Sequence, residues 1–185
     1  MDISQITPQL FISAWPREGE SPHVRELGIR LVISMTSREP LSEFSAEPLM
    51  WVLIPSIDSP LTPIALSGLK RGVEAAIPVL ASGAGVLCHC REGHHRSVPM
   101  ACCILIAQGH SAESAMNLAS AKRRVADPRA FWIAPRIRNF ERRWTGGWKD
   151  EIDVPPEARS KAAASQTESA RVIEPDDGLP AHLNA

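Results

Sequence analysis

The stretch from Gly85 to Gly109 constrains the fold of this chain more than any other. An apolar run, GVLCHC, precedes five polar or charged residues interrupted by one glycine, REGHHR, and a second apolar run, SVPMACCILIAQG, follows them. The first run has the length of a buried strand, and the second is long enough for a buried helix that tolerates Pro99 in its first turn. We therefore expect a charged loop between a buried strand and the N-terminus of a helix.

The sequence on either side of this stretch alternates in the same way. Apolar runs at 9–13, 29–35 and 49–55 predict three further strands, and residues 21–28 predict a short helix. A longer helix is expected to open at Thr62, and two more over 111–124 and 129–144. The helix that opens at Thr62 has an apolar stripe at helical spacing, which consists of Leu66, Leu69, Val73, Ala76, Ile77 and Leu80. The order predicts an α/β fold with a central mixed, mostly parallel sheet flanked by helices.

The composition changes after residue 145. From Asp150 onward the chain carries eight acidic residues against three basic ones, with few large apolar side chains. Such a segment buries too little apolar surface to offset the entropy of ordering. We predict one folded domain over 1–145 and a disordered acidic tail over 146–185.

Charge and cysteine content narrow the partners and the compartment. The formal net charge of -1 offers no general attraction to nucleic acid or to an anionic membrane. The most apolar stretch, Met100–Ala107, is too short to span a bilayer, and the N-terminus has no signal-peptide run. Four cysteines, two of them adjacent, do not suggest a secreted disulfide framework. We expect a cytoplasmic protein with no nucleic-acid or membrane partner, and the oligomeric state stays open.

The charged loop could in principle hold a metal, because cysteine and histidine are zinc ligands. However, Cys88 and Cys90 on a strand face the side opposite to His89, and no second ligand pair lies elsewhere at finger-like spacing. Simple packing in the core explains Cys102 and Cys103, which lie in the apolar run after the loop. It does not explain the loop itself, whose charged residues cannot all be buried. We therefore expect no metal and no cofactor.

The loop is better suited to grip an anion beside a nucleophile. Five residues separate Cys90 from Arg96, with Gly93 midway and Ser97 directly after the arginine. Loop N–H groups and the helix N-terminus would lower the pKa of the Cys90 thiol and favour the thiolate. The planar fork of arginine matches two phosphate oxygens, and glycine lets the backbone turn with its N–H inward.

The pattern C-x-x-G-x-x-R-S after a histidine resembles the signature of the cysteine-dependent protein tyrosine phosphatases. HCREGHHRS is most similar to the dual-specificity branch. That branch supplies an aspartate about thirty residues before its cysteine, and here IPSIDSP places Asp58 32 residues before Cys90. The openings ITPQLFIS and LGIRLVISM also look like the first strands of this family, so the resemblance covers about residues 7 to 145.

This resemblance implies a phosphomonoester hydrolase of the protein-tyrosine or dual-specificity type that uses no metal. It implies that Cys90 is the nucleophile, that Asp58 is the general acid and that Arg96 holds the phosphate oxygens. Ser97 would help the sulfur leave, and His89 would orient the loop from behind. The remaining loop residues would bind substrate: Arg91, Glu92, Gly93, His94 and His95. We also expect the Glu92 carboxylate to brace the loop rather than to act as the acid.

The substrate is less constrained than the reaction. No long loop is available to wall a deep pocket, which favours a phosphoprotein site that takes phosphotyrosine and also phosphoserine or phosphothreonine. Two alternatives stay open: a phosphate-binding pseudophosphatase that serves as an interaction module, or a phosphatase for RNA 5′ ends or phospholipids. The basic cluster of Arg123, Arg124 and Arg129 is interpreted as a solvated helix end. We further hypothesise that oxidised Cys90 pairs with Cys88, Cys102 or Cys103.

Overall fold

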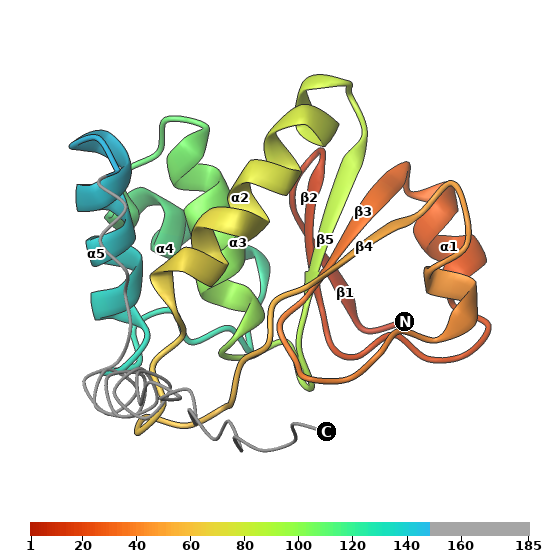
Figure 1. Ribbon diagram of the computed structural model, residues 1–185, viewed down its shortest axis with the longest axis horizontal. Coiled ribbons are helices and arrows are strands. Elements are labelled where there is room, and N and C mark those ends of the chain that lie inside the picture. The colour runs from red at the N-terminus through yellow and green to blue at the C-terminus, as the bar shows by residue number, and fades with distance from the viewer. Residues whose placement is uncertain (149–185) are drawn as a thin grey trace, which may run out of the picture. The chain divides into compact units, whose positions relative to one another are not determined.

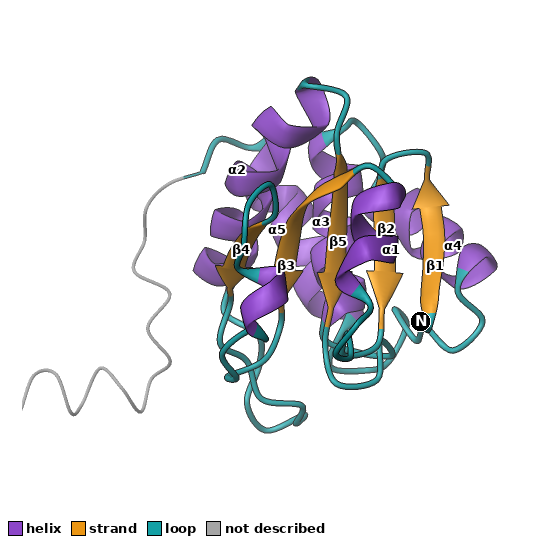
Figure 2. Cartoon of the chain, turned by 90° about the vertical axis from the view of Figure 1, so that its right-hand side faces the viewer, coloured by secondary structure: helices purple, strands orange, loops and turns teal. Residues whose placement is uncertain are grey.

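A computed structural model describes residues 1–148 of the chain. Its centre is a five-stranded sheet with the order β1-β2-β5-β3-β4, which Figure 2 shows with β1 and β4 at the two edges. β1 pairs antiparallel with β2, and all other neighbours are parallel. This confirms the predicted mixed, mostly parallel sheet. The strands are β1 (Ile3–Thr7), β2 (Leu10–Ser13), β3 (Ile29–Ser34), β4 (Met50–Leu53) and β5 (Gly85–His89).

Helices cover both faces of the sheet unequally. Figure 1 shows α1 on one face and the other four helices on the opposite face. A 3-10 turn, η1 (Ser42–Phe44), precedes β4. The helices are α1 (Ser21–Glu26), α2 (Leu66–Ala81), α3 (Ser97–Ala107), α4 (Ala112–Lys122) and α5 (Ala134–Thr145). None of the helices in residues 1–148 is long and apolar enough to cross a membrane.

The alternation of side chains along each strand creates two cores. In β2, Leu10 and Ile12 belong to the larger core together with α2 to α5, while Phe11 belongs to the smaller core together with Val24 of α1. α3 is buried along almost its whole length, so that it lies in the middle of the larger core. This burial on all sides explains why its sequence is apolar without a polar face.

The structure corrects several sequence expectations. β1 was not predicted, because its residues ISQIT contain only two apolar side chains and just one of them, Ile6, is buried. α2 begins at Leu66 rather than at Thr62, and Ile77, which was expected in the apolar stripe, is 43% exposed. α5 begins only at Ala134, with a proline in its first turn, rather than at residue 129. The predicted tail over 146–185 lies outside the described residues except for 146–148.

The parallel strands place their following loops at one edge of the sheet. β2, β3, β4 and β5 are parallel, so the segments after Ser13, Ser34, Leu53 and His89 all leave the sheet at the same edge. The charged loop follows β5, the central strand, and leads into α3. Segments distant in sequence can therefore contribute side chains around this loop.

Candidate active site

Cys90 lies at the floor of the loop between β5 and α3. Its side chain is 1% exposed, and two groups donate hydrogen bonds to its sulfur. The Gly93 N–H donates to Cys90 Sγ at 3.2 Å, and the Ser97 hydroxyl donates to it at 3.4 Å. Gly93 has a φ of +70°, a left-handed conformation that favours glycine. The turn at Gly93 thus brings a backbone N–H against the sulfur.

These contacts decide the protonation of the buried thiol. Burial by itself raises the pKa of Cys90, because a thiolate loses solvation. The Ser97 hydroxyl and the N–H groups of Ser97, Glu92 and Gly93 act in the opposite direction, since each N–H or O–H dipole stabilises the charged sulfur. The hydrogen bonds outweigh burial, and the pKa of Cys90 is lowered from its ordinary value. Cys90 is therefore a buried sulfur that ionises to the nucleophilic thiolate more readily than an ordinary cysteine.

Arg96 lies at the end of the loop that begins at Cys90 and is nearly buried, with 7% of the residue exposed. Its Nη1 donates to the Ser56 carbonyl at 3.2 Å, which joins the loop to the segment after β4. Its Nε is 3.6 Å from Asp58 Oδ2 and has no hydrogen-bond partner among the described residues. A buried guanidinium with an unused N–H is ready to donate to an anion in the loop.

Asp58 reaches the loop from the segment after β4. Its Oδ1 lies 3.3 Å from His95 Nδ1, and its carboxylate also faces Arg96. The Asp58 side chain is 40% exposed, so it stands at the mouth of the site rather than at its floor. The structure thus brings together Cys90, Arg96 and Asp58, which the sequence analysis placed in one site.

The other predicted loop residues lie around the rim. Arg91 and Glu92 are exposed, while His94 and His95 are partly exposed. Glu92, which was expected to brace the loop, directs its carboxylate to His94 Nδ1 at 3.9 Å within the loop itself. The His95 ring packs edge-on against Trp132 with ring centroids 5.4 Å apart. Glu92 therefore forms its ion pair within the loop itself.

His89 lies behind the loop and is fully buried. Its ring contacts Trp15 and Trp51 at centroid distances of 5.2 and 5.0 Å, and its Nδ1 lies 3.4 Å from the Cys90 carbonyl. Burial lowers the pKa of His89 to about 4, and Arg96 adds to the effect. A neutral ring that is packed between two indoles can hold the start of the loop in place.

A pocket of about 470 Å³ opens over Arg96. It is larger than a phosphate group needs, so it has room for the group that carries the phosphate. Arg38 belongs to its wall and lies over the Trp15 ring, with 5.9 Å from guanidinium carbon to ring centroid. The residues that line it are Trp15, Thr36, Ser37, Arg38, Ser56, Ile57, Asp58, Arg91 and Arg96. Neither Trp15 nor Arg38 was identified from the sequence.

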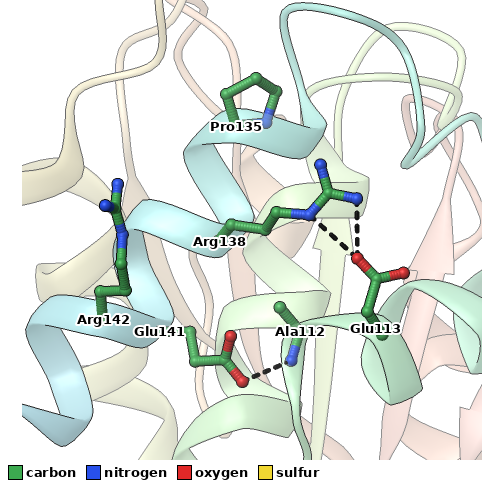
Figure 3. A pocket seen from close by; sticks show the side chains of 6 residues that line it. All are labelled: Ala112, Glu113, Pro135, Arg138, Glu141 and Arg142. Atoms are coloured by element: carbon green, nitrogen blue, oxygen red, sulfur yellow. Dashed lines mark hydrogen bonds and ion pairs between the residues drawn. The ribbon is translucent and has the colours of Figure 1, made fainter.

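A second hollow lies between α4 and α5 and contains none of the predicted residues (Figure 3). Its charged groups already have partners: Arg138 donates to Glu113 at 2.7 Å, and Glu141 accepts from the Ala112 N–H at 2.8 Å. This hollow has no group left in a reactive arrangement, and the pocket over Arg96 remains the candidate site. Among residues 1–148, no three His, Cys, Asp or Glu side chains are grouped so as to hold a metal ion.

Arg123 was not identified as a site residue from the sequence. It was interpreted as part of a solvated helix end, but its side chain is 2% exposed and donates to the carbonyls of Gly93 and Glu92. No signal in the sequence separates it from Arg124, which is exposed. The four cysteines carry free thiols in this structure, so the proposed pairing of Cys90 with a neighbour stays a prediction.

Comparison with known proteins agrees with this geometry. No family model matches the chain. Human dual specificity protein phosphatase 12 is 36% identical over 98 residues, which cover 51% of this chain. The matched region spans only 28% of that relative's length.

Solved structures share the fold over most of the described domain. Human DUSP28 superposes with a TM-score of 0.69 at 19% identity, covering 77% of this chain and 98% of that one. PTPMT1 gives a TM-score of 0.69 at 21% identity, covering 78% and 96%. Human tyrosine phosphatase-like serine/threonine/tyrosine-interacting protein gives 0.67 at 18% identity, covering 78% and 98%. The sequence match and the shared fold together confirm the resemblance of this chain to the dual-specificity branch of the cysteine-dependent protein tyrosine phosphatase superfamily.

Proposed function

We propose that this chain hydrolyses phosphomonoesters on proteins through a phosphocysteine intermediate. The observation that carries the proposal is the environment of Cys90: hydrogen bonds to its buried sulfur lower the pKa of the thiol, and Arg96 at the other end of the same loop has an Nε–H with no hydrogen-bond partner among the described residues. A carboxylic acid from a separate segment reaches the same mouth. Nucleophile, anion binder and acid are the three groups that this transfer requires.

The first step transfers the phosphoryl group to sulfur. The Cys90 thiolate attacks phosphorus in line, the P–S bond forms and the bond to the leaving oxygen breaks. Arg96 and the loop N–H groups hold the equatorial oxygens, where the negative charge of the transition state collects. Protonated Asp58 donates its proton to the leaving oxygen, which departs as a neutral alcohol or phenol.

The second step regenerates the enzyme. Asp58, now a carboxylate, accepts a proton from water as the water oxygen attacks phosphorus. The P–S bond breaks, and inorganic phosphate and the Cys90 thiolate result. The Ser97 hydroxyl, which donates to Sγ at 3.4 Å, stabilises the sulfur as its negative charge returns.

Phosphoproteins are the substrate class we favour. The pocket wall combines the Trp15 ring with the cationic Arg38 and Arg91, which suits an aromatic phosphoester or an extended peptide. A cytoplasmic location, and the absence of a nucleic-acid or membrane partner, belong to this proposal. The oligomeric state is not part of it.

A phospholipid is the second candidate, because one structural neighbour is PTPMT1 in complex with PI(5)P. The loop in this chain has no lysine, and Glu92 places a negative charge on its rim. Both features favour a singly phosphorylated substrate over a highly charged headgroup. Parallel assays with phosphopeptides, short-chain phosphoinositides and a 5′-phosphorylated RNA would rank the three classes by kcat/KM.

Turnover of aryl phosphates in the presence of EDTA tests the reaction itself. We expect Asp58→Asn to lower kcat by about 10²–10⁴-fold for a poor leaving group and by much less for a good one, as loss of a general acid does. Glu74→Gln, which makes the same acid-to-amide change at an exposed position on α2, is the matched control and should leave both rates near wild type.

Three outcomes would contradict the proposal. Folded, reduced wild-type protein that binds phosphate but releases none from any aryl phosphate would indicate a pseudophosphatase. Activity that EDTA abolishes would indicate a metal mechanism. An equal loss for good and poor leaving groups in Asp58→Asn would show that Asp58 is not the acid.

A further inference from the structure

Arg123 directly follows α4 and is among the most buried charged side chains in residues 1–148, with 2% exposed. All three of its nitrogens are engaged. Nε donates to the Gly93 carbonyl at 2.8 Å, and Nη2 donates to the Glu92 carbonyl at 3.2 Å. Nη1 donates to the Ser4 hydroxyl at 3.2 Å. The guanidinium therefore joins the charged loop between Cys90 and Ser97, hereafter the phosphate loop, to the edge strand β1.

The backbone of the phosphate loop is held from outside at four successive carbonyls. The Trp15 N–H donates to the Arg91 carbonyl, and the Asp127 N–H donates to the His94 carbonyl, both at 3.1 Å. Arg123 holds the two carbonyls between them. Of these four contacts, only the two from Arg123 come from a side chain, so they are the two that a substitution can remove.

Holding a carbonyl outward fixes the neighbouring N–H inward. A peptide unit is planar and trans, so its C=O and its N–H point in opposite directions. The Glu92 carbonyl shares its peptide unit with the Gly93 N–H, which donates to Cys90 Sγ at 3.2 Å. The Gly93 carbonyl shares its unit with the His94 N–H. Arg123 thus sets the direction of two dipoles that an anion in the loop would meet.

Asp2 in turn holds Arg123. Its two carboxylate oxygens accept from Nη1 at 3.1 Å and from Nη2 at 2.8 Å. The hydrogen bond from Arg123 is the largest cause of a lowered pKa at Asp2, so this carboxylate is ionised at neutral pH. Asp2 is 63% exposed at its side chain, whereas Arg123 is enclosed. The carboxylate neutralises the buried cation and fixes the plane of its fork.

From these contacts we propose that Arg123, oriented by Asp2, is a positioning residue that turns two peptide groups of the phosphate loop toward the sulfur and the bound anion. The inference rests on the proposed function only in that the loop binds phosphate. It predicts that the reactivity of Cys90 and the affinity of the loop for phosphate both depend on Arg123. This residue lies 33 positions after Cys90 in the sequence and contacts neither the sulfur nor the anion.

The test compares Arg123→Met, Arg123→Lys and Asp2→Asn with the wild type. The first readout is alkylation of Cys90 by iodoacetamide as a function of pH, followed by mass spectrometry. The second is competitive inhibition by inorganic phosphate. In Arg123→Met we expect the alkylation midpoint to rise by about one pH unit or more, and phosphate inhibition to weaken about tenfold. We also expect kcat to fall about 100-fold, as it does when an oxyanion donor is lost.

The other two variants should show smaller losses than Arg123→Met. Arg123→Lys keeps the charge without the fork and should recover part of the loss, while Asp2→Asn should show the smallest shift in the same direction. Arg30→Met is the matched control, because Arg30 also donates to two backbone carbonyls but lies at the opposite end of β3. It should alter thermal stability without moving the alkylation midpoint.

Alkylation does not require turnover, so it separates this inference from the proposed function. A wild type with no phosphatase activity but a low alkylation midpoint that rises in Arg123→Met would refute only the proposed function. A folded Arg123→Met with wild-type alkylation and phosphate inhibition would overturn the positioning role. If Arg123→Met does not fold, unchanged profiles in both Arg123→Lys and Asp2→Asn would overturn it equally.

Discussion

The end of β5 and the first residue of the loop that follows it are both buried, yet their surroundings act on titratable side chains in opposite ways. Burial raises the pKa of Cys88 and lowers that of His89 to about 4, so both side chains are driven to their neutral forms. Cys90, the next residue, is almost as enclosed, but its pKa is lowered, so its thiolate forms more readily than that of an ordinary cysteine. Burial decides the charge on the strand and fails to decide it in the loop.

Hydrogen-bond donors account for this difference. Cys88 faces the apolar core beside Cys102, whose own pKa burial raises to about 12. Cys90 instead receives one hydroxyl and several N–H groups at its sulfur. This comparison indicates that the hydrogen-bond donors directed at a buried cysteine, and not its depth of burial, make it reactive.

Removing each sulfur in turn tests this contrast with the largest expected effect. Cys90→Ser should lower phosphate release by at least about 10⁴-fold, because a serine hydroxyl in the same place is not ionised. Cys88→Ala should leave kcat within about threefold and lower stability by about 1–2 kcal/mol through the cavity it creates. Aryl phosphate turnover and denaturant unfolding measure the two effects. Comparable loss of turnover in a well-folded Cys88→Ala would erase the distinction.

Gly93→Ala should displace the N–H that donates to Cys90 while leaving the sulfur itself in place. A Cβ at Gly93 would lie 2.5 Å from Arg123 Nη2 and 2.7 Å from the Ser13 carbonyl oxygen, at a φ of +70°. The loop must shift, and the N–H that donates to Sγ shifts with it. We expect kcat/KM to fall about 10²–10³-fold, the cost of one misplaced oxyanion donor.

Gly28→Ala is the control that separates the effect of a positive φ from the effect of a steric clash at the new Cβ. Gly28 has a φ of +73°, but a Cβ there would have no atom within 4 Å. It should cost about 1–2 kcal/mol of stability and leave kcat/KM unchanged. An equal loss of activity in both variants would mean that global destabilisation explains the effect.

The part of the site that could be predicted from the sequence is the part encoded by local spacing. Cys90, Gly93 and Arg96 belong to one short loop, so their order along the chain fixes their proximity. Asp58 was found through its distance along the chain from Cys90, and the structure places it beside Arg96. The strand before the loop and the helix after it were predicted for the same reason, since their apolar runs are continuous.

What escaped prediction depends on contacts with backbone atoms or on tertiary position. Arg123 bonds to carbonyls, which every residue possesses, so no pair of side chains reveals the contact in the sequence. β1 escaped because only one face of this edge strand is covered and its alternation is weak. Ile77 continues an apolar helical stripe in sequence, yet its position on α2 is 43% exposed. Periodicity predicts a face, but the neighbouring elements decide how wide that face is.

The pH dependence of stability sharpens the comparison at His89. The fold lowers the pKa of this base, so only the unfolded chain binds a proton as the pH falls below about 6.5, the ordinary histidine value. Stability from His89 is therefore complete above pH 6.5 and declines toward pH 4. Between pH 6.5 and 5 we expect a loss of about 2 kcal/mol. His89→Phe keeps an aromatic ring between the two indoles but removes this slope.

Denaturant unfolding at several pH values measures the difference between the two proteins. The window ends at pH 5 because the carboxyls whose pKa the fold lowers, such as Asp2 and Glu43, begin to matter only at lower pH. Contributions common to both proteins cancel in the difference. Parallel slopes for wild type and His89→Phe would show that burial does not hold this ring neutral.

Ser97→Ala removes one donor from Cys90 and is expected to have the smallest effect. The Ser97 hydroxyl is the largest of the contributions that lower the pKa of Cys90, and its removal leaves the N–H donors in place. A hydrogen bond to a charged group is worth about 1.5 kcal/mol, so the thiolate fraction at pH values well below the pKa of the thiol should fall about tenfold. Alkylation of Cys90 should slow to that extent in this acidic range and reach the wild-type rate at high pH, where the thiol is ionised in both proteins. Ser21→Ala, which alters another buried serine on α1, is the control and should leave the whole profile in place. A profile that is unchanged in Ser97→Ala would assign the low pKa to the loop N–H groups alone, and a rate reduced at every pH would indicate a displaced loop instead of a lost donor.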